Sequence, residues 1–191
     1  MFFNLPNILT LFRIFCIPLL VILLALQTGV SSIIALVVYI LACVTDYLDG
    51  AIARRTNQFS ELGRMMDPIA DKLLVGALLL VLAGLGSLKY LSLYAAVIIL
   101  LREIAVSGLR EFMATYQDKI PSTRLAKWKT GLQMVALGFF VLGDGGAAEM
   151  GMGKIPVFMI GAVLLWLSVI PTVLTGWGYL KAGIRRMRVI S

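Results

Sequence analysis

Apolar residues dominate long stretches of the chain, and charged residues gather near the ends of these stretches. A helix needs about 20 mostly apolar residues to cross the hydrocarbon core of a bilayer. Six stretches approach or reach that length when charged residues are accepted in their end turns. The pattern therefore predicts six transmembrane helices, over residues 7–27, 31–54, 63–85, 89–112, 127–142 and 155–180.

The connections between these stretches are short. The longest are residues 113–126 and the glycine-rich residues 143–154, which we expect to form loops. Because no room remains for a separate soluble domain, the sequence predicts one all-α polytopic membrane domain over residues 1–191. We also expect no cleaved signal peptide, because the first residues lack a cationic segment and a small-residue cleavage site.

The composition agrees with a membrane protein. Of the 191 residues, 60% are hydrophobic and only 14% are charged, and the mean hydropathy is +0.97. These values lie far from those of soluble domains. The net charge is nevertheless +7. In a membrane protein, such an excess indicates anionic membrane lipids or a phosphate-bearing substrate rather than nucleic acid.

The cationic side chains cluster at one set of helix ends, and the opposite ends carry little beyond Lys89 and Lys154. By the positive-inside rule, both termini and the two basic loops are expected to be cytoplasmic in a multi-pass protein of the inner (plasma) membrane. An even number of spans agrees with this orientation. The cationic ends contain Arg54, Arg55, Arg64, Lys119, Arg124, Lys127, Lys129, Lys181, Arg185, Arg186 and Arg188.

Two pairs of aspartates flank the loop between the second and third predicted helices. Their i,i+3 and i,i+4 spacings place each pair on one face of its helix. Helices joined by a short loop would bring the two pairs together, where they would repel unless a cation lay between them. An alternative is that they cap helix ends or pair with neighbouring arginines and lysines. The pairs are Asp46 with Asp49 and Asp67 with Asp71.

The chain contains no histidine. A metal bound here would therefore be held by oxygen ligands, which favours Mg²⁺ or Mn²⁺ over zinc. Two such ions suit displacement at phosphorus, where the attacking and leaving oxygens both need charge stabilisation. Gly50 and Gly63 would allow close approach to the backbone, and Arg54 is a natural partner for a diphosphate.

The motif D-x-x-D-G-x-x-A-R, eight residues, G-x-x-x-D-x-x-x-D runs from Asp46 to Asp71. It resembles the signature of the CDP-alcohol phosphotransferases. The resemblance implies the six-helix fold of that family, usually a homodimer, with a site open to the cytoplasm. It also implies that Gly50 and Arg54 contact the CDP group and that Asp71 is the general base. Two metal ions would be held by Asp46, Asp49, Asp67 and Asp71.

Further stretches are similar to the bacterial phosphatidylglycerophosphate synthase branch of that family, whose donor is CDP-diacylglycerol. Asn7 and Thr10 match positions that touch the cytidine, and Ser60 matches a serine that meets the nucleotide. For Asn7 and Thr10 the alternative is an ordinary helix N-terminus, where such residues cap free N–H groups.

Cations at the ends of the fourth and fifth predicted helices would suit an acceptor that carries its own phosphate, such as sn-glycerol 3-phosphate. Snorkelling towards lipid head groups is the competing explanation. We expect Glu103 to orient an arginine by ion pairing. The cations assigned to the acceptor are Arg102, Arg110, Lys127 and Lys129.

Two other functions remain open at this point. A member of the same family could use another acceptor, such as an inositol phosphate. A cation transporter also places carboxylates among membrane helices, but its acidic residues would lie near the bilayer midplane. The aspartates here lie at helix ends, which favours the transferase.

Overall fold

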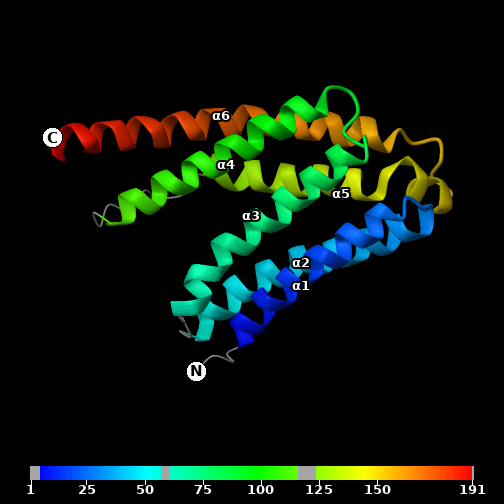
Figure 1. Ribbon diagram of the computed structural model, residues 1–191, viewed down its shortest axis with the longest axis horizontal. Helices are drawn as coiled ribbons and strands as arrows, with labels where there is room; N and C mark the ends of the chain where they lie inside the picture. The colour runs from blue at the N-terminus through cyan, green and yellow to red at the C-terminus, as the bar shows by residue number, and fades with distance from the viewer. Residues whose placement is uncertain (1–4, 57–60, 116–123, 191) are drawn as a thin grey trace. The chain divides into compact units, whose positions relative to one another are not determined.

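The computed structural model describes residues 5–56, 61–115 and 124–190. These residues form helices and short turns, with no strand among them, which confirms the predicted all-α class (Figure 1). The helices are α1 (Leu5–Ala25), α2 (Gly29–Thr56), α3 (Glu61–Gly84), α4 (Ser92–Thr115), α5 (Arg124–Glu149) and α6 (Val157–Ile190).

Five of the six helices are long and apolar enough to cross a membrane, as expected of a multi-pass protein. The exception is α3, because Asp67, Asp71 and Lys72 interrupt its first turns and leave only residues 73–84 as an apolar run. The five candidate spans are Ile8–Ala25, Gly29–Asp46, Ser92–Met113, Leu125–Glu149 and Val157–Arg185.

The chain divides into two compact units. Unit 1 comprises Met1–Leu88 and Leu137–Phe158, and unit 2 comprises Lys89–Ala136 and Met159–Ser191. Unit 1 thus contains α1, α2, α3 and the second half of α5. The first half of α5 belongs to unit 2, together with α4 and nearly all of α6.

In unit 1, α1 packs against both α2 and α3, and α1 lies alongside α2 (Figure 1). A reciprocal cap begins α2: the N–H of Ser31 donates to Thr28 Oγ1 at 3.1 Å, and the N–H of Thr28 donates to Ser31 Oγ at 3.2 Å. These bonds satisfy donors that the first helical turn leaves free. The cap explains why α2 begins before the predicted start at residue 31.

The prediction of a loop over residues 143–154 is wrong for its first half, because α5 continues to Glu149. The helix is interrupted at Gly143, whose φ of 60° and ψ of 174° favour glycine. A Cβ atom there would lie 3.1 Å from the Phe158 ring. The Asp144 carboxylate accepts the N–H of Phe158 at 3.1 Å and so caps the start of α6.

Close contact between α2 and the end of α5 explains why this glycine-rich segment is helical. Gly146 is buried, and a Cβ atom there would lie 3.1 Å from Ser32 Cβ and 3.5 Å from the Gly29 carbonyl oxygen. Small residues at such a crossing let two backbones approach closely. The packing offsets the low helix propensity of glycine.

Beside an apolar core, the units bury several polar side chains and expose many large apolar ones. Phe15, Leu80 and Trp177 are among the exposed large apolar residues, and the largest fully buried side chain in the described residues is that of Arg13. This arrangement is typical of helices surrounded by lipid, where polar groups face the protein interior. The other buried polar residues are Thr10, Ser31, Ser92, Lys129, Gln133, Ser168, Thr172 and Thr175.

Replacing Gly146 with Leu should lower the midpoint of thermal unfolding in detergent, because the new side chain would force α2 and α5 apart. Overpacking of this kind costs about 1–3 kcal/mol. Gly145→Leu is the matched control, because a Cβ atom at Gly145 meets nothing within 4 Å. Equal shifts for the two variants would contradict the close contact.

Candidate active site

In unit 1, one arginine joins two aspartates of the sequence motif. Arg13 Nη1 lies 2.6 Å from Asp46 Oδ1 and 3.2 Å from Asp71 Oδ1. Arg13 comes from the middle of α1, Asp46 from α2 and Asp71 from the start of α3. The three helices thus bring two carboxylates of the motif to a single guanidinium nitrogen.

Burial explains why this arginine needs both partners. The Arg13 side chain is fully buried, whereas the side chains of Asp46 and Asp71 are 37% and 47% exposed. An unpaired charge is very unfavourable in an apolar interior, so a buried guanidinium requires carboxylates beside it. The partial exposure of the two carboxylates leaves them accessible to a ligand.

Two described side chains are of the type that binds a hard metal ion, although no group of three candidate ligands occurs among the described residues. Asp46 and Asp71 provide carboxylate oxygens, the ligand type that Mg²⁺ and Mn²⁺ prefer, and both already contact one cationic nitrogen. Arg13 also supplies positive charge of its own. The cation that the structure places between the two carboxylates is Arg13, and the metal site remains a prediction.

Several predicted site residues lie outside the described part of the chain. Thr10 is described: it is 1% exposed and lies one helical turn before Arg13 on α1. Its predicted contact with cytidine remains a prediction. Outside the description are Ser60, the side chains of Asn7, Asp49, Arg54 and Asp67, and the surroundings of Gly50.

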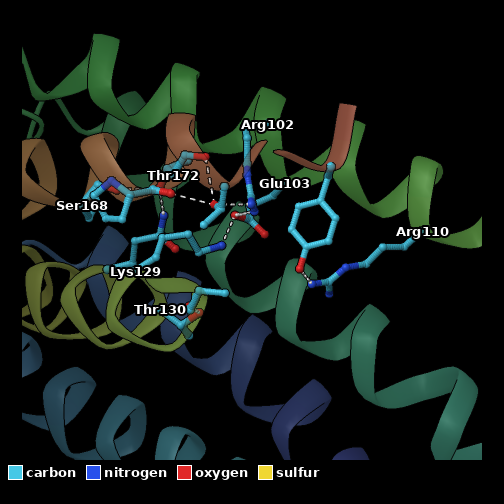
Figure 2. A network of polar contacts seen from close by, with 12 residues as sticks. Arg102, Glu103, Arg110, Lys129, Thr130, Ser168 and Thr172 are labelled. Carbon is cyan, nitrogen blue, oxygen red and sulfur yellow. Dashed lines mark hydrogen bonds and ion pairs between the residues drawn. The ribbon is translucent and has the colours of Figure 1, made fainter. Parts of the chain in front are cut away.

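A second charged cluster lies in unit 2, where Glu103 joins two cations (Figure 2). Its Oε1 accepts a hydrogen bond from Arg102 Nη1 at 2.9 Å and another from Lys129 Nζ. Glu103 and Arg102 belong to α4, and Lys129 belongs to α5. The expectation that Glu103 orients an arginine is confirmed, and the structure adds Lys129 to the same carboxylate oxygen.

Hydroxyl groups of α6 complete this cluster. Arg102 Nη2 donates to Thr175 Oγ1 at 2.6 Å, and Gln133 Nε2 of α5 donates to Thr172 Oγ1 at 3.2 Å. Thr175 and Thr172 donate their own protons to the carbonyl oxygens of Pro171 and Ser168, both at 2.6 Å. Each hydroxyl therefore donates a hydrogen bond to a carbonyl oxygen of α6 and also accepts one from a side chain of α4 or α5.

A glycine on α6 makes room for the arginine. A Cβ atom at Gly176 would lie 3.1 Å from Arg102 Cγ and 3.3 Å from its Nε. The stem of Arg102 therefore crosses α6 where a side chain is absent. This contact, together with Glu103 and Thr175, holds the Arg102 side chain in place and leaves it 12% exposed.

Arg110, two helical turns after Arg102 on α4, contacts a tyrosine of α6. Its Nη2 donates to the Tyr179 hydroxyl oxygen at 2.5 Å, and its Cζ lies 4.7 Å from the centre of the ring. Arg102 Cζ lies 5.8 Å from the same centre. Both guanidinium groups are within the range of a cation–π interaction.

Lys127 differs from Lys129. The side chain of Lys129 is buried against Glu103, whereas Lys127 is exposed and lines a shallow groove with Trp128, Gly131 and Val135. Residues two positions apart on a helix point to different sides. The structure therefore brings Arg102 and Lys129 together at Glu103 and Arg110 near Arg102, but does not bring Lys127 to Glu103.

Sequence reasoning missed Arg13, Thr175 and Tyr179 as parts of these clusters. For Arg13 a signal exists, because it is the only charged side chain that precedes Asp46 in the chain. A lone charge inside an apolar span is rarely without a function. For Thr175 and Tyr179 the sequence has no comparable signal, because threonine and tyrosine are ordinary residues of membrane helices.

Replacing Arg13 with Gln should lower the midpoint of thermal unfolding in metal-free detergent solution. The variant loses two hydrogen bonds to charged groups, each worth about 1.5–3 kcal/mol, and leaves Asp46 and Asp71 without their shared cation. Added Mg²⁺ or Mn²⁺ should restore part of the loss by supplying charge to the same carboxylates. Arg185→Gln, at an exposed position of α6, is the control. A loss that divalent ions leave unchanged would contradict a cation site at Asp46 and Asp71.

The chain is similar in sequence to known proteins. The CDP-alcohol phosphatidyltransferase family profile matches residues 3–174. The CDP-diacylglycerol–glycerol-3-phosphate 3-phosphatidyltransferase of Rickettsia typhi is 40% identical over 179 residues, which cover 94% of this chain and 96% of the relative. The protein of the same name from Cereibacter sphaeroides is 35% identical, over 93% of this chain and 94% of its own.

A third relative comes from another group of bacteria. The protein of Mycobacterium tuberculosis named probable phosphatidylglycerophosphate synthase is 36% identical over 187 residues, which cover 95% of this chain and 82% of the relative. The family profile spans most of the chain, and it includes both charged clusters. The chain belongs to the CDP-alcohol phosphatidyltransferase family.

Proposed function

We propose that this protein transfers the phosphatidyl group of CDP-diacylglycerol to sn-glycerol 3-phosphate and releases CMP, as the first step of phosphatidylglycerol synthesis. The cluster of cations in unit 2 is the observation that carries this proposal. Arg102 and Lys129 share a single carboxylate, Glu103, and Arg110 lies with Arg102 against the neutral ring of Tyr179, so these four charged residues carry more positive than negative charge. An acceptor that carries a phosphate would balance that excess.

The names of the relatives support the same reaction, because the Rickettsia and Cereibacter proteins are named for glycerol 3-phosphate as the acceptor. An acceptor without a phosphate, such as serine, would not balance the positive charge that remains after Glu103 has paired with Arg102 and Lys129. Lys127 is proposed as a further contact to the acceptor on the basis of the sequence alone.

The donor is proposed to bind in unit 1. Asp46, Asp49, Asp67 and Asp71 would hold two divalent ions, Mg²⁺ or Mn²⁺, which when bound would stabilise negative charge around the reacting phosphate. The fit of Asp46 and Asp71 to a cation supports this assignment. The proposed contacts to the CDP portion are Asn7, Thr10, Gly50, Arg54 and Ser60.

In the proposed reaction, Asp71 accepts the proton of the acceptor hydroxyl. The acceptor oxygen forms a bond to the phosphorus of the phosphatidyl group, and the bond from that phosphorus to the CMP oxygen breaks. CMP leaves with the electron pair, next to Arg54. The Asp71 side chain is about half exposed, as a base that must reach a substrate requires.

The proposal includes the setting in the membrane. Six spans, with α3 as the charged one, would return both termini to the cytoplasmic side. The basic residues near the ends of α2, α5 and α6 support that orientation by the positive-inside rule. We also propose a homodimer, because members of the family that the chain resembles are usually homodimers.

Purified protein with CDP-diacylglycerol should release CMP when sn-glycerol 3-phosphate is present, and chelation should abolish that release. Mg²⁺ or Mn²⁺ should restore it, because clustered carboxylates need a counter-charge. The measurement is CMP release with a panel of acceptors that includes glycerol, serine and an inositol phosphate. Full turnover in excess chelator would overturn the metal site, and release with the inositol phosphate alone would identify a different acceptor.

Asp71→Asn should lower the single-turnover rate by roughly 10² to 10⁴, because the amide keeps one oxygen but cannot accept the proton. Binding of CDP-diacylglycerol should largely survive. Asp46→Asn should instead weaken metal and donor binding together, because it removes charge from the cation site. If added metal restores the rate of Asp71→Asn, Asp71 is mainly a metal ligand and another group is the base.

A further inference from the structure

Tyr179 is the residue of α6 that contacts both arginines of α4. It is 4% exposed, accepts a hydrogen bond from Arg110 at 2.5 Å, and has the two guanidinium groups 4.7 Å and 5.8 Å from the centre of its ring. A buried tyrosine hydroxyl needs a partner, and Arg110 provides it.

The two arginines are held in different ways. Arg102 lies against Gly176 and has bonds to Glu103 and Thr175, so it is fixed by several helices. Arg110 is an exposed residue near the end of α4, and the contacts that the structure gives its side chain are those to Tyr179. An exposed arginine has many rotamers, so a rigid ring with two torsion angles restricts it strongly.

The chemistry of the partner matters as much as its rigidity. A carboxylate at this position would hold Arg110 but would also cancel its charge. The hydroxyl oxygen and the aromatic face of Tyr179 are neutral, so Arg110 is held and keeps its full positive charge. Arg102, Glu103, Arg110 and Lys129 together carry a formal excess of two positive charges, opposite in sign and equal in size to the charge of a phosphate monoester dianion.

We infer that Tyr179 is a positioning residue for the acceptor, which orients Arg110 towards the phosphate of a phosphate monoester without neutralising it. The inference rests on the proposed function, because it assigns Arg110 to the phosphate of the acceptor. The inference means that α6, as well as α4 and α5, contributes to the selection of the acceptor.

The test compares steady-state kinetics of Tyr179→Phe, Tyr179→Leu and the wild type with both substrates. Tyr179→Phe keeps the ring and loses the hydroxyl, so KM for glycerol 3-phosphate should rise about tenfold, as expected for a lost hydrogen bond to a charged group. Tyr179→Leu loses the ring as well and should raise it further, to about 10²-fold. KM for CDP-diacylglycerol should stay within about twofold. Tyr94→Phe, at an exposed position of α4, is the matched control and should change neither constant.

A double-mutant cycle separates positioning from general structural damage. In an Arg110→Ala background, Tyr179→Phe should produce no further rise in KM for glycerol 3-phosphate, because the residue acts through Arg110. Full additivity of the two changes, or equal rises in KM for both substrates, would overturn the inference. Unchanged KM in Tyr179→Phe and Tyr179→Leu would overturn it as well.

Binding of inorganic phosphate to the purified protein distinguishes this inference from the proposed function. Isothermal titration should show weaker phosphate binding in Tyr179→Phe than in the wild type. If the wild type releases no CMP with glycerol 3-phosphate but Tyr179→Phe still weakens phosphate binding, the proposed acceptor is wrong and the positioning role stands. If the wild type is active and phosphate binding is the same in both proteins, the positioning role is wrong and the function stands.

Discussion

A charge inside an apolar helical unit must be paired, and this constraint organises both units of the protein. In unit 1 the buried guanidinium of Arg13 requires carboxylates, and it obtains them from α2 and α3. In unit 2 the buried Lys129 and the nearly buried Arg102 require a carboxylate, and both obtain Glu103. Because an unpaired buried ion is so unfavourable, each cluster ties together the helices that supply it.

The two clusters differ in the charge that remains. At Arg13, one cation lies between two carboxylates, so the described groups retain a negative excess that suits a further cation. In unit 2, Glu103 contacts two cations and a third, Arg110, is held by Tyr179, so the excess among these residues is positive and suits an anion. The neutral partners of α6 preserve that excess, because hydroxyl groups and an aromatic face hold an arginine without cancelling its charge.

Sequence reasoning anticipated much of the site where residues lie close together in the chain. The ion pair of Arg102 with Glu103 joins neighbours, and the approach of Asp46 to Asp71 follows from two helices with a short connection. The contacts of Arg13 and of Tyr179 join residues far apart in the chain, so no local spacing predicts them. The prediction of a loop directly after Gly143 was wrong, because the helix there depends on contact with α2 rather than on helix propensity.

By itself, the sequence determined the all-α class, the multi-pass character with five of the six predicted spans, and the acidic motif, because hydrophobic length and residue spacing are local properties of the chain. Only the tertiary structure decided which charges meet. It paired Arg13 with the motif, buried Lys129 rather than Lys127 against Glu103, and placed Tyr179 against the arginines of α4. The physical reason is that packing with the other helices determines the rotation of each helix about its axis. Each turn contains several residues, and composition alone does not predict which of them faces the neighbouring helix.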